Sequence, residues 1–201
     1  MKEKFINSSI NLVCRYQECD DLKLKRLRYG LEGMYSLIVK LSVVIIISII
    51  TNTIRETLLF LLFYAGIRTF SYGMHAKSNI ACWITTITIY NIIPILLSSI
   101  SVPRYIGYII LGIALISMIL WAPADTPNKP LIRKKQRQKC KILSIIIVLI
   151  YTIIYLMNKT LIINNALLYA LTIQIIFINP LTYKITNTQF NNYKHYKKKI
   201  K

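Results

Sequence analysis

The stretch SLIVKLSVVIIISIITN, residues 36–52, decides the fold class of this chain. It is an almost unbroken apolar run, and its one charged side chain, Lys40, is long enough to reach a nearby membrane interface. A helix needs roughly 20 such residues to cross the hydrocarbon core of a bilayer. Because 55% of the 201 residues are hydrophobic and cluster in similar runs, the sequence predicts an all-α membrane protein.

Further apolar runs follow this one, each bounded by polar or charged residues. We predict six transmembrane helices, at about residues 36–52, 54–67, 79–100, 105–121, 142–157 and 161–179. Pro94 interrupts the third run and is expected to kink it, because proline lacks the backbone N–H that a helix needs. Residues 36–180 then form a six-helix membrane domain, preceded by an N-terminal segment, residues 1–35, and followed by a basic tail, residues 181–201.

Positive charges divide unevenly between the two sides of this predicted domain. With six alternating spans, 22 Lys and Arg residues fall on one side, and three, Arg55, Arg104 and Lys159, fall on the other. Loops rich in Lys and Arg stay in the cytosol, so both termini of this multi-pass cell-membrane protein are expected there. A net charge of +19 is also typical of nucleic-acid-binding proteins, but in so apolar a chain it sets topology and attracts anionic lipids. The expected partners are membrane lipids and no nucleic acid.

The N-terminal segment has apolar residues at near-helical spacing among charged ones: Phe5, Ile6, Ile10, Val13 and Tyr16. This pattern indicates an amphipathic helix that lies in the membrane interface, and a solvated tail is the alternative. Cys14 and Cys19 fall in this segment, where cytosolic thiols are expected to stay reduced. No histidine or second cysteine pair accompanies them, so no metal site is expected.

A second informative stretch is RTFSYGMHAKSNIACW, residues 68–83, between the second and third apolar runs. It holds His75 and Cys82, which on one continuous helix would stand about 10.5 Å apart along the axis, too far for a thiol and its general base. Gly73 can end the preceding helix, and Ser78 can cap a new one. Cys82 would then lie at the end of a first helical turn, where the helix dipole and protonated His75 favour a thiolate. By itself the pair is also compatible with a buried thiol and a capping histidine.

The spacing Arg-x4-Gly-x-His-Ala-x-Ser-x3-Cys, formed by Arg68, Gly73, His75, Ala76, Ser78 and Cys82, resembles that of the accessory gene regulator B (AgrB) family of membrane cysteine peptidases. A second segment, APADTPNKPL at residues 122–131, resembles the family's Pro-Ala-Asp/Glu-Thr segment after the fourth span. A basic cluster follows it as in the family: Arg133, Lys134 and Lys135. The resemblance covers essentially the whole chain. One departure is Tyr72-Gly73 where the family usually has Gly-Gly, which is expected to stiffen the loop.

That resemblance implies a membrane cysteine endopeptidase that processes a quorum-sensing propeptide, with Cys82 as nucleophile and His75 as base and then acid. The implied partner is a peptide pheromone precursor with an acidic C-terminal tail, whose signal segment is closed into a thiolactone or lactone through an acyl-enzyme. No cofactor or metal is implied, and a homodimer is left open. The alternative from another class is a non-enzymatic small multipass transporter or immunity-type protein, which no inverted repeat or paired intramembrane acid supports.

The remaining candidate residues each have two alternative roles. Arg68, Gly73 and Ser78 either orient the loop or contact the substrate. The basic cluster either binds the acidic tail or only fixes the topology. Asp125 either orients the histidine as a third catalytic member or caps a helix.

Overall fold

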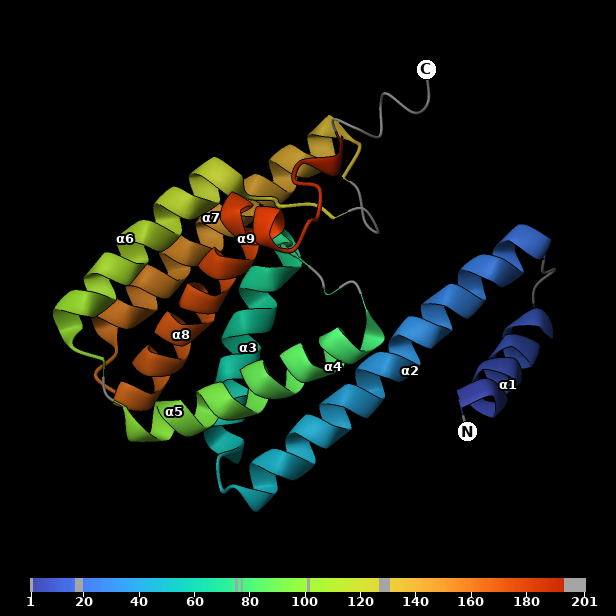
Figure 1. Cartoon of the computed structure of the whole chain (residues 1–201), viewed down its shortest axis with the longest axis horizontal. Coiled ribbons are helices and arrows are strands. Elements are labelled where there is room, and N and C mark those ends of the chain that lie inside the picture. The colour runs from blue at the N-terminus through green and yellow to red at the C-terminus, as the bar shows by residue number, and fades with distance from the viewer. Residues whose placement is uncertain are drawn as a thin grey trace. The chain divides into compact units, whose positions relative to one another are not determined.

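The computed structural model describes residues 2–16, 20–74, 76, 78–100, 102–126 and 131–193. Within these residues the chain is helical and has no β-strand (Figure 1). It divides into two compact units, residues 1–47 and residues 48–201. In chain order the helices are α1 (Lys2–Cys14), α2 (Asp21–Ile50), α3 (Ile54–Ser71), α4 (Asn79–Ile87), the π-helical turn η1 (Thr88–Ile92), α5 (Ile93–Ser99), α6 (Arg104–Trp121), α7 (Lys134–Met157), α8 (Leu161–Ile178) and α9 (Pro180–Ile185).

Four of these helices, α2, α6, α7 and α8, are long and apolar enough to cross a bilayer. The predicted all-helical architecture built on long apolar helices is therefore confirmed. Helix α3 carries Arg55, Glu56 and Arg68, and the α4–α5 region contributes a shorter apolar helix, Ile80–Leu96. The count of six spans remains a prediction.

Two helices begin earlier than the apolar runs indicate. Helix α2 begins at Asp21 rather than near Ser36, and α7 begins at Lys134 rather than near Ile142. The added residues are mostly Lys, Arg, Leu, Glu and Gln, which are good helix formers. An apolar run marks only the part of a helix that can enter lipid, so it misses these polar extensions.

The third apolar run is a helix with an irregular centre. Its hydrogen-bonding pattern changes from α to π over Thr88–Ile92 and returns to α at Ile93. Pro94 follows directly, and its ring would clash with the carbonyl of Tyr90, four residues earlier, in a regular helix. The wider π turn relieves this conflict, so the irregularity occurs where the proline predicts a disturbance.

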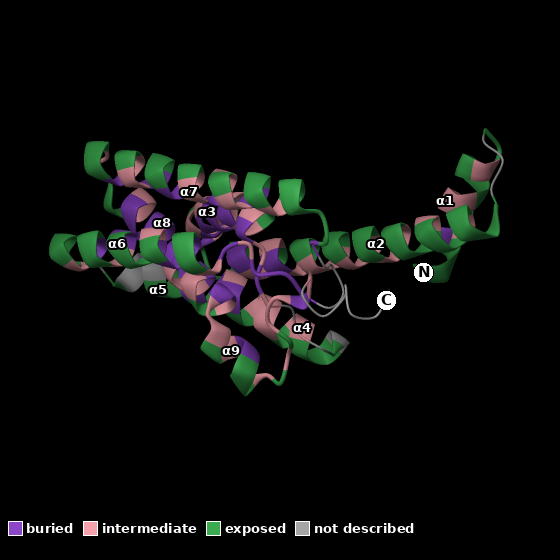
Figure 2. Cartoon of the chain, turned by 90° about the horizontal axis from the view of Figure 1, so that it is seen from above, coloured by how far each residue is buried: buried purple, intermediate pink, exposed green. Residues whose placement is uncertain are grey.

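The larger unit is organised around α3 and α8, which make its most extensive helix pairing. Figure 2 shows buried residues concentrated on these two helices and exposed residues along the outer sides of α6 and α7. From α3, Phe60 and Ile67 are fully buried, as are Leu167 and Leu171 from α8. The Tyr151 hydroxyl of α7 donates to the carbonyl of Phe63, 2.8 Å away, and so joins a third helix to this core.

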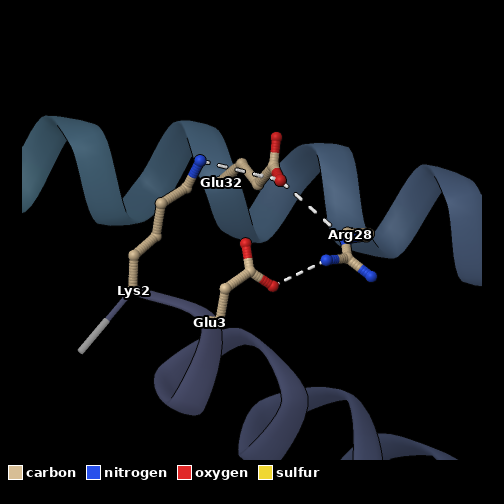
Figure 3. Close-up of polar contacts among 4 residues, drawn as sticks. All are labelled: Lys2, Glu3, Arg28 and Glu32. Carbon is tan, nitrogen blue, oxygen red and sulfur yellow. Dashed lines mark hydrogen bonds and ion pairs between the residues drawn. The ribbon is translucent and has the colours of Figure 1, made fainter.

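The smaller unit joins α1 to α2 through charges at the start of the chain. Figure 3 shows Arg28 between two carboxylates, with Nη2 2.7 Å from Glu3 and Nε 3.8 Å from Glu32. Lys2 Nζ lies 3.7 Å from Glu32. These side chains are partly exposed, so each pair contributes well under ~1 kcal/mol. The charges therefore fix the register of the two helices more than they stabilise the unit.

Helix α1 coincides with the segment predicted to be amphipathic. The ring of Phe5 packs 5.7 Å from that of Tyr35 on α2, so part of its apolar face is directed at protein. Its position in a membrane interface remains a prediction. Cys14 is disulfide-bonded, which corrects the expectation of a reduced thiol. Helix α1 ends at this residue, and the chain turns there towards α2.

The tail begins with structure that its basic composition does not indicate. Asn179 caps α9, its side-chain oxygen accepting a hydrogen bond from the Leu181 amide at 2.9 Å. Tyr183 is buried, and its ring meets that of Phe190 at 5.1 Å. The start of the tail thus packs on the bundle. Residues 194–201, where the sequence predicts a basic disordered end, lie outside the described residues.

Gly107 on α6 marks the closest approach between helices in the larger unit. A Cβ built there would overlap the Tyr155 hydroxyl and lie 3.2 Å from Leu168 Cδ1. Gly112 is one and a half turns further along α6, and a Cβ there would meet nothing within 4 Å. The two glycines therefore provide a matched pair, one in contact and one open.

We expect Gly107→Ala to separate α6 from α7 and α8 and to lower the free energy of unfolding by about 1–3 kcal/mol. Gly112→Ala should be neutral, or stabilising by up to about 1 kcal/mol, because alanine is the better helix former. Thermal unfolding of the detergent-solubilised protein, followed by intrinsic tryptophan fluorescence, measures both. Equal melting temperatures for the two variants would contradict the packing described for Gly107.

Candidate functional site

The candidate site begins where α3 ends and the backbone leaves helical geometry. Tyr72 has φ +57°, and Gly73 has φ +124°, a value that L side chains rarely adopt. A Cβ at Gly73 would overlap the Arg68 guanidinium and lie 3.0 Å from the carbonyl oxygen of Phe177. Glycine is required at position 73 for both reasons.

Tyr72 occupies the position at which the sequence departs from the expected Gly-Gly pair. Its positive φ, combined with ψ −139°, lies near a region almost confined to glycine and costs about 1–3 kcal/mol. The phenol lies against the Cys140 thiol of α7, and burial, followed by this contact, raises the pKa of Tyr72. Contact of the ring with α7 offsets part of the backbone strain.

Backbone hydrogen bonds attach this turn to two distant segments. The Gly73 amide donates to the carbonyl of Ala124 at 2.8 Å, and the Met74 amide donates to that of Phe177 at 2.9 Å. In return, the Ala124 amide donates to the carbonyl of Ser71 at 3.0 Å. The residues directly before His75 are thus held by the α6–α7 connection and by the end of α8.

Arg68 holds the carbonyl side of the same turn. Its Nη2 donates to the carbonyl oxygens of Gly73, at 3.3 Å, and of Met74. Its guanidinium carbon lies 5.0 Å from the ring centre of Phe177. Arg68 Nη1 is buried without a hydrogen-bond partner among the described residues. The contacts that are present are those of a loop-orienting residue, and one guanidinium nitrogen is left for a further acceptor.

Gln174 is a buried loop-holding residue that the sequence reading missed. Its Nε2 donates to Ser71 Oγ at 2.5 Å and to the carbonyl of Tyr72 at 2.7 Å. Its Oε1 has no partner in the described part of the chain. The available signal was a polar amide in the middle of an apolar run, because such groups are costly in a membrane unless they pair within the protein.

Asp125 is buried and fixes the segment that follows α6. Its carboxylate accepts from the backbone amides of Leu131 at 3.2 Å, Asn192 at 2.9 Å and Tyr193 at 3.0 Å. Burial raises the pKa of Asp125, and the three amide donors and nearby Arg137 oppose that rise. None of these donors belongs to the first turn of α7. Asp125 therefore links the α6–α7 connection to the C-terminal segment, where Asn192 and Tyr193 are helical, and it does not cap α7.

Ser78 begins α4 with the geometry of an N-cap. Its backbone is extended, and its Oγ accepts from the Ala81 amide at 3.1 Å. The Cys82 amide donates to the Ser78 carbonyl at 3.0 Å, so Cys82 closes the first turn, as the sequence predicts. Cys82 is half-buried and is not in a disulfide. His75 and its separation from Cys82 lie outside the described residues.

The basic cluster opens α7. Arg133 is the N-cap residue, Lys134 and Lys135 start the first turn, and all three side chains are exposed. Cations at a helix N-terminus repel the positive end of the helix dipole, so they do not stabilise the helix. The ion pairs among the described residues all lie in the smaller unit. The start of α7 is thus an uncompensated positive surface, attached through the same connection to the Gly73 turn.

Comparison with known proteins shows which family this chain belongs to. A model described as "Accessory gene regulator B" matches residues 6–178. The chain belongs to the accessory gene regulator B family. An AgrB-like protein of Listeria innocua is 31% identical over 90% of this chain and 89% of its own length. The accessory gene regulator protein B of Staphylococcus carnosus is 29% identical over 76% of this chain and 79% of its own length. No solved structure matches.

Family membership confirms the resemblance based on the two motifs at residues 68–82 and 122–131. The match extends from α1 to the last residue of α8, so it covers every described helix except α9. The two motifs are 40 residues apart in sequence, and in the structure they contact each other through Gly73 and Ala124. The family's conspicuous segments therefore form one structural unit.

Gln174→Leu is expected to release the turn before His75. Leaving Ser71 Oγ and the Tyr72 carbonyl without their donor should cost about 1–3 kcal/mol and accelerate backbone hydrogen exchange at Gly73 and Met74. Thr172→Val is the matched control, since within the described part of the chain the Thr172 hydroxyl bonds to the Leu168 carbonyl of its own helix alone. Hydrogen-exchange mass spectrometry of both variants measures the effect. Exchange at residues 73–74 that is unchanged by Gln174→Leu would contradict the assigned role.

Proposed function

We propose that this chain is a membrane cysteine endopeptidase that removes the C-terminal tail of a quorum-sensing propeptide and cyclises the remaining signal segment. The observation that carries the proposal is the Ser78-capped helix with Cys82 at the end of its first turn. The turn at residues 72–74, pinned from three directions, precedes it. Membership of the accessory gene regulator B family supports the same activity.

Cys82 acts as the nucleophile and His75 as its base. The thiolate attacks the carbonyl at the junction between signal and tail, the peptide C–N bond breaks, and His75 protonates the leaving amine. The signal segment remains on Cys82 as a thioester. An internal thiol or hydroxyl of the substrate then attacks this thioester, Cys82 leaves, and a thiolactone or lactone ring closes. Exclusion of water decides between ring closure and hydrolysis, and a site at the membrane interface favours closure.

The buried contacts of the loop suit this chemistry because both reacting groups belong to one short segment. A thiol and its base must come within about 3 Å of each other. Arg68 and Gly73 fix the backbone on one side of His75, and Ser78 fixes it on the other. Arg68 Nη1, which has no partner among the described residues, can donate to a substrate carbonyl or help to orient the histidine loop.

The proposed topology has six crossings, by α2, α3, the α4–α5 region, α6, α7 and α8, with both termini in the cytosol. The 22-to-3 distribution of Lys and Arg supports it. Helix α3 reaches the required length, and its polar Arg68 pairs inside the protein. Helix α1 would lie in the cytosolic interface. The active-site loop and the basic cluster then face the compartment in which the propeptide is made.

Alkylation kinetics test the proposed dyad. Cys82 should react with iodoacetamide faster than the buried Cys140, but exposure alone predicts that order. The decisive change is His75→Ala, which should slow alkylation of Cys82 and leave that of Cys140 unaltered. In inverted membrane vesicles, a membrane-impermeant maleimide should label Cys82, whereas right-side-out vesicles should protect it.

Propeptide cleavage completes this test. Cys82→Ala and His75→Ala should abolish tail release, and the matched Cys140→Ala should retain it. Normal processing by Cys82→Ala, or a Cys82 rate indifferent to His75, would refute the peptidase. A transporter would keep its transport activity in Cys82→Ala.

The acidic tail of the substrate is expected to bind the basic cluster. Replacing Arg133, Lys134 and Lys135 together with glutamine should raise KM at least tenfold with little change in kcat, and raised ionic strength should act similarly on the wild type. Replacement of three other exposed cations, Lys23, Lys25 and Arg26, is the matched control. If both triple variants process a propeptide with unchanged KM, the basic cluster is only a topology signal.

A further inference from the structure

The far end of the larger unit contains a cavity, lined by both polar and apolar residues, that is separate from the candidate site. Its volume is about 350 Å³, within the range of small-ligand sites. Eight residues line it: Val102, Arg104, Tyr155, Asn158, Lys159, Leu161, Asn164 and Asn165. They come from the start of α6, the end of α7 and the start of α8. The Gly73 turn contacts the opposite ends of α6 and α8, about 27 Å away along these 18-residue helices.

Two cationic residues and no acidic residue are among those that line this cavity. Arg104 and Lys159 line it, both have exposed side chains, and the ion pairs of the described residues lie elsewhere. Helices α6 and α8 also both begin here, and neither N-cap residue, Pro103 or Thr160, supplies a side-chain capping bond. The positive ends of two helix dipoles, together with the two cations, favour an anion.

Asparagine side chains give the cavity a second kind of chemistry. Asn165 is satisfied, since its amide spans the Ile100 carbonyl at 3.0 Å and the Val102 amide at 3.4 Å. Asn164 Nδ2 donates to the Asn158 carbonyl at 3.0 Å, which fixes the orientation of its amide. Its Oδ1 is buried and accepts no hydrogen bond from the described residues. A buried acceptor without a donor indicates a ligand that carries a hydroxyl or amine hydrogen.

The residues around the cavity, and its position at the helix ends, are typical of a site that binds a lipid headgroup. It lies at the ends of apolar helices long enough to span a bilayer, which is the depth of the polar headgroups. Exposed Tyr105 and Tyr108 flank Arg104 on α6, as aromatic residues do at membrane interfaces. Leu161, also exposed, supplies an apolar wall at the rim. A free anion would gain nothing from contact with this apolar border, whereas the acyl chains of a lipid can pack against it.

We propose that this cavity binds the headgroup of an anionic phospholipid that carries free hydroxyls, as phosphatidylglycerol does. The phosphodiester lies between Arg104, Lys159 and the two helix N-termini. A headgroup hydroxyl donates to Asn164 Oδ1, and the acyl chains run along the exposed apolar side of α6 and α8. Because the site joins α6, α7 and α8, bound lipid ties these helices together at the end away from the candidate active site.

Native mass spectrometry of the detergent-solubilised full chain, titrated with dioleoyl-phosphatidylglycerol, tests this site. Arg104→Gln and Lys159→Gln should each weaken binding about fivefold. Arg55→Gln is the matched control: it removes one exposed cation from the same end of the bundle, outside the cavity, and should change binding less than twofold. All three replaced side chains are exposed, so the variants should fold, and thermal unfolding verifies this.

A second arm separates the charge from the hydroxyl. Phosphatidylmethanol has the same charge and acyl chains but no headgroup hydroxyl, so it should bind more weakly than phosphatidylglycerol. Asn164→Ala should remove that difference without weakening phosphatidylmethanol. Equal binding of the two lipids to the wild type would refute hydroxyl recognition. An Arg55→Gln effect as large as that of Arg104→Gln would reduce the site to general surface charge, and full displacement by millimolar inorganic phosphate would identify a free-anion site instead.

Discussion

A non-helical turn that is buried must find its hydrogen bonds within the protein, and this requirement organises the larger unit. The chain leaves helical geometry at residues 72–74, between two apolar helices. The amides and carbonyls that are released inside the protein are costly unless they find new partners there. The Ala124 and Phe177 carbonyls, Arg68 and Gln174 meet that demand, from segments up to about a hundred residues apart. The turn is therefore a product of the assembled bundle.

One consequence is that two distant segments, the α6–α7 connection and the C-terminal segment, help to stabilise the turn of the candidate site. Ala124 bonds to the turn, and its neighbour Asp125 accepts three backbone amides, two of them from the C-terminal segment. Tyr183 of α9 also donates to the Ala124 carbonyl, at 3.0 Å. The connection that leads into the basic cluster is thus fastened to the turn on one side and to the C-terminal segment on the other. Binding of an acidic peptide at the start of α7 would act on the same hydrogen-bonded assembly that holds the turn at residues 72–74.

Polar groups inside the apolar helices mark both ends of the larger unit. At one end, Gln174 supports the turn. At the other, Asn164 and Asn165 face the cavity between α6, α7 and α8. Each is an amide within α8, the helix whose contacts with α3 dominate the core. Amides can donate and accept without carrying charge, so they satisfy irregular backbone at the membrane boundary at less desolvation cost than an ion would require.

The class of the protein, the approximate helices and the place of Cys82 in the first turn of α4 follow from the sequence alone. Apolar runs give helices because every backbone group in lipid must be paired, and Ser78 predicts the start of α4 through a purely local capping bond. The sequence also determined the family, through two short motifs. The tertiary structure was needed to show that those motifs touch, that Arg68 holds loop carbonyls, and that Asp125 binds backbone amides far from it in the chain. The same holds for Gln174 and for the lengths of α2 and α7 beyond their apolar cores. The contacts depend on partners far away in the chain, about which local patterns carry no information. The helix lengths depend on polar residues that are compatible with helix and loop alike, so the local pattern does not distinguish the two.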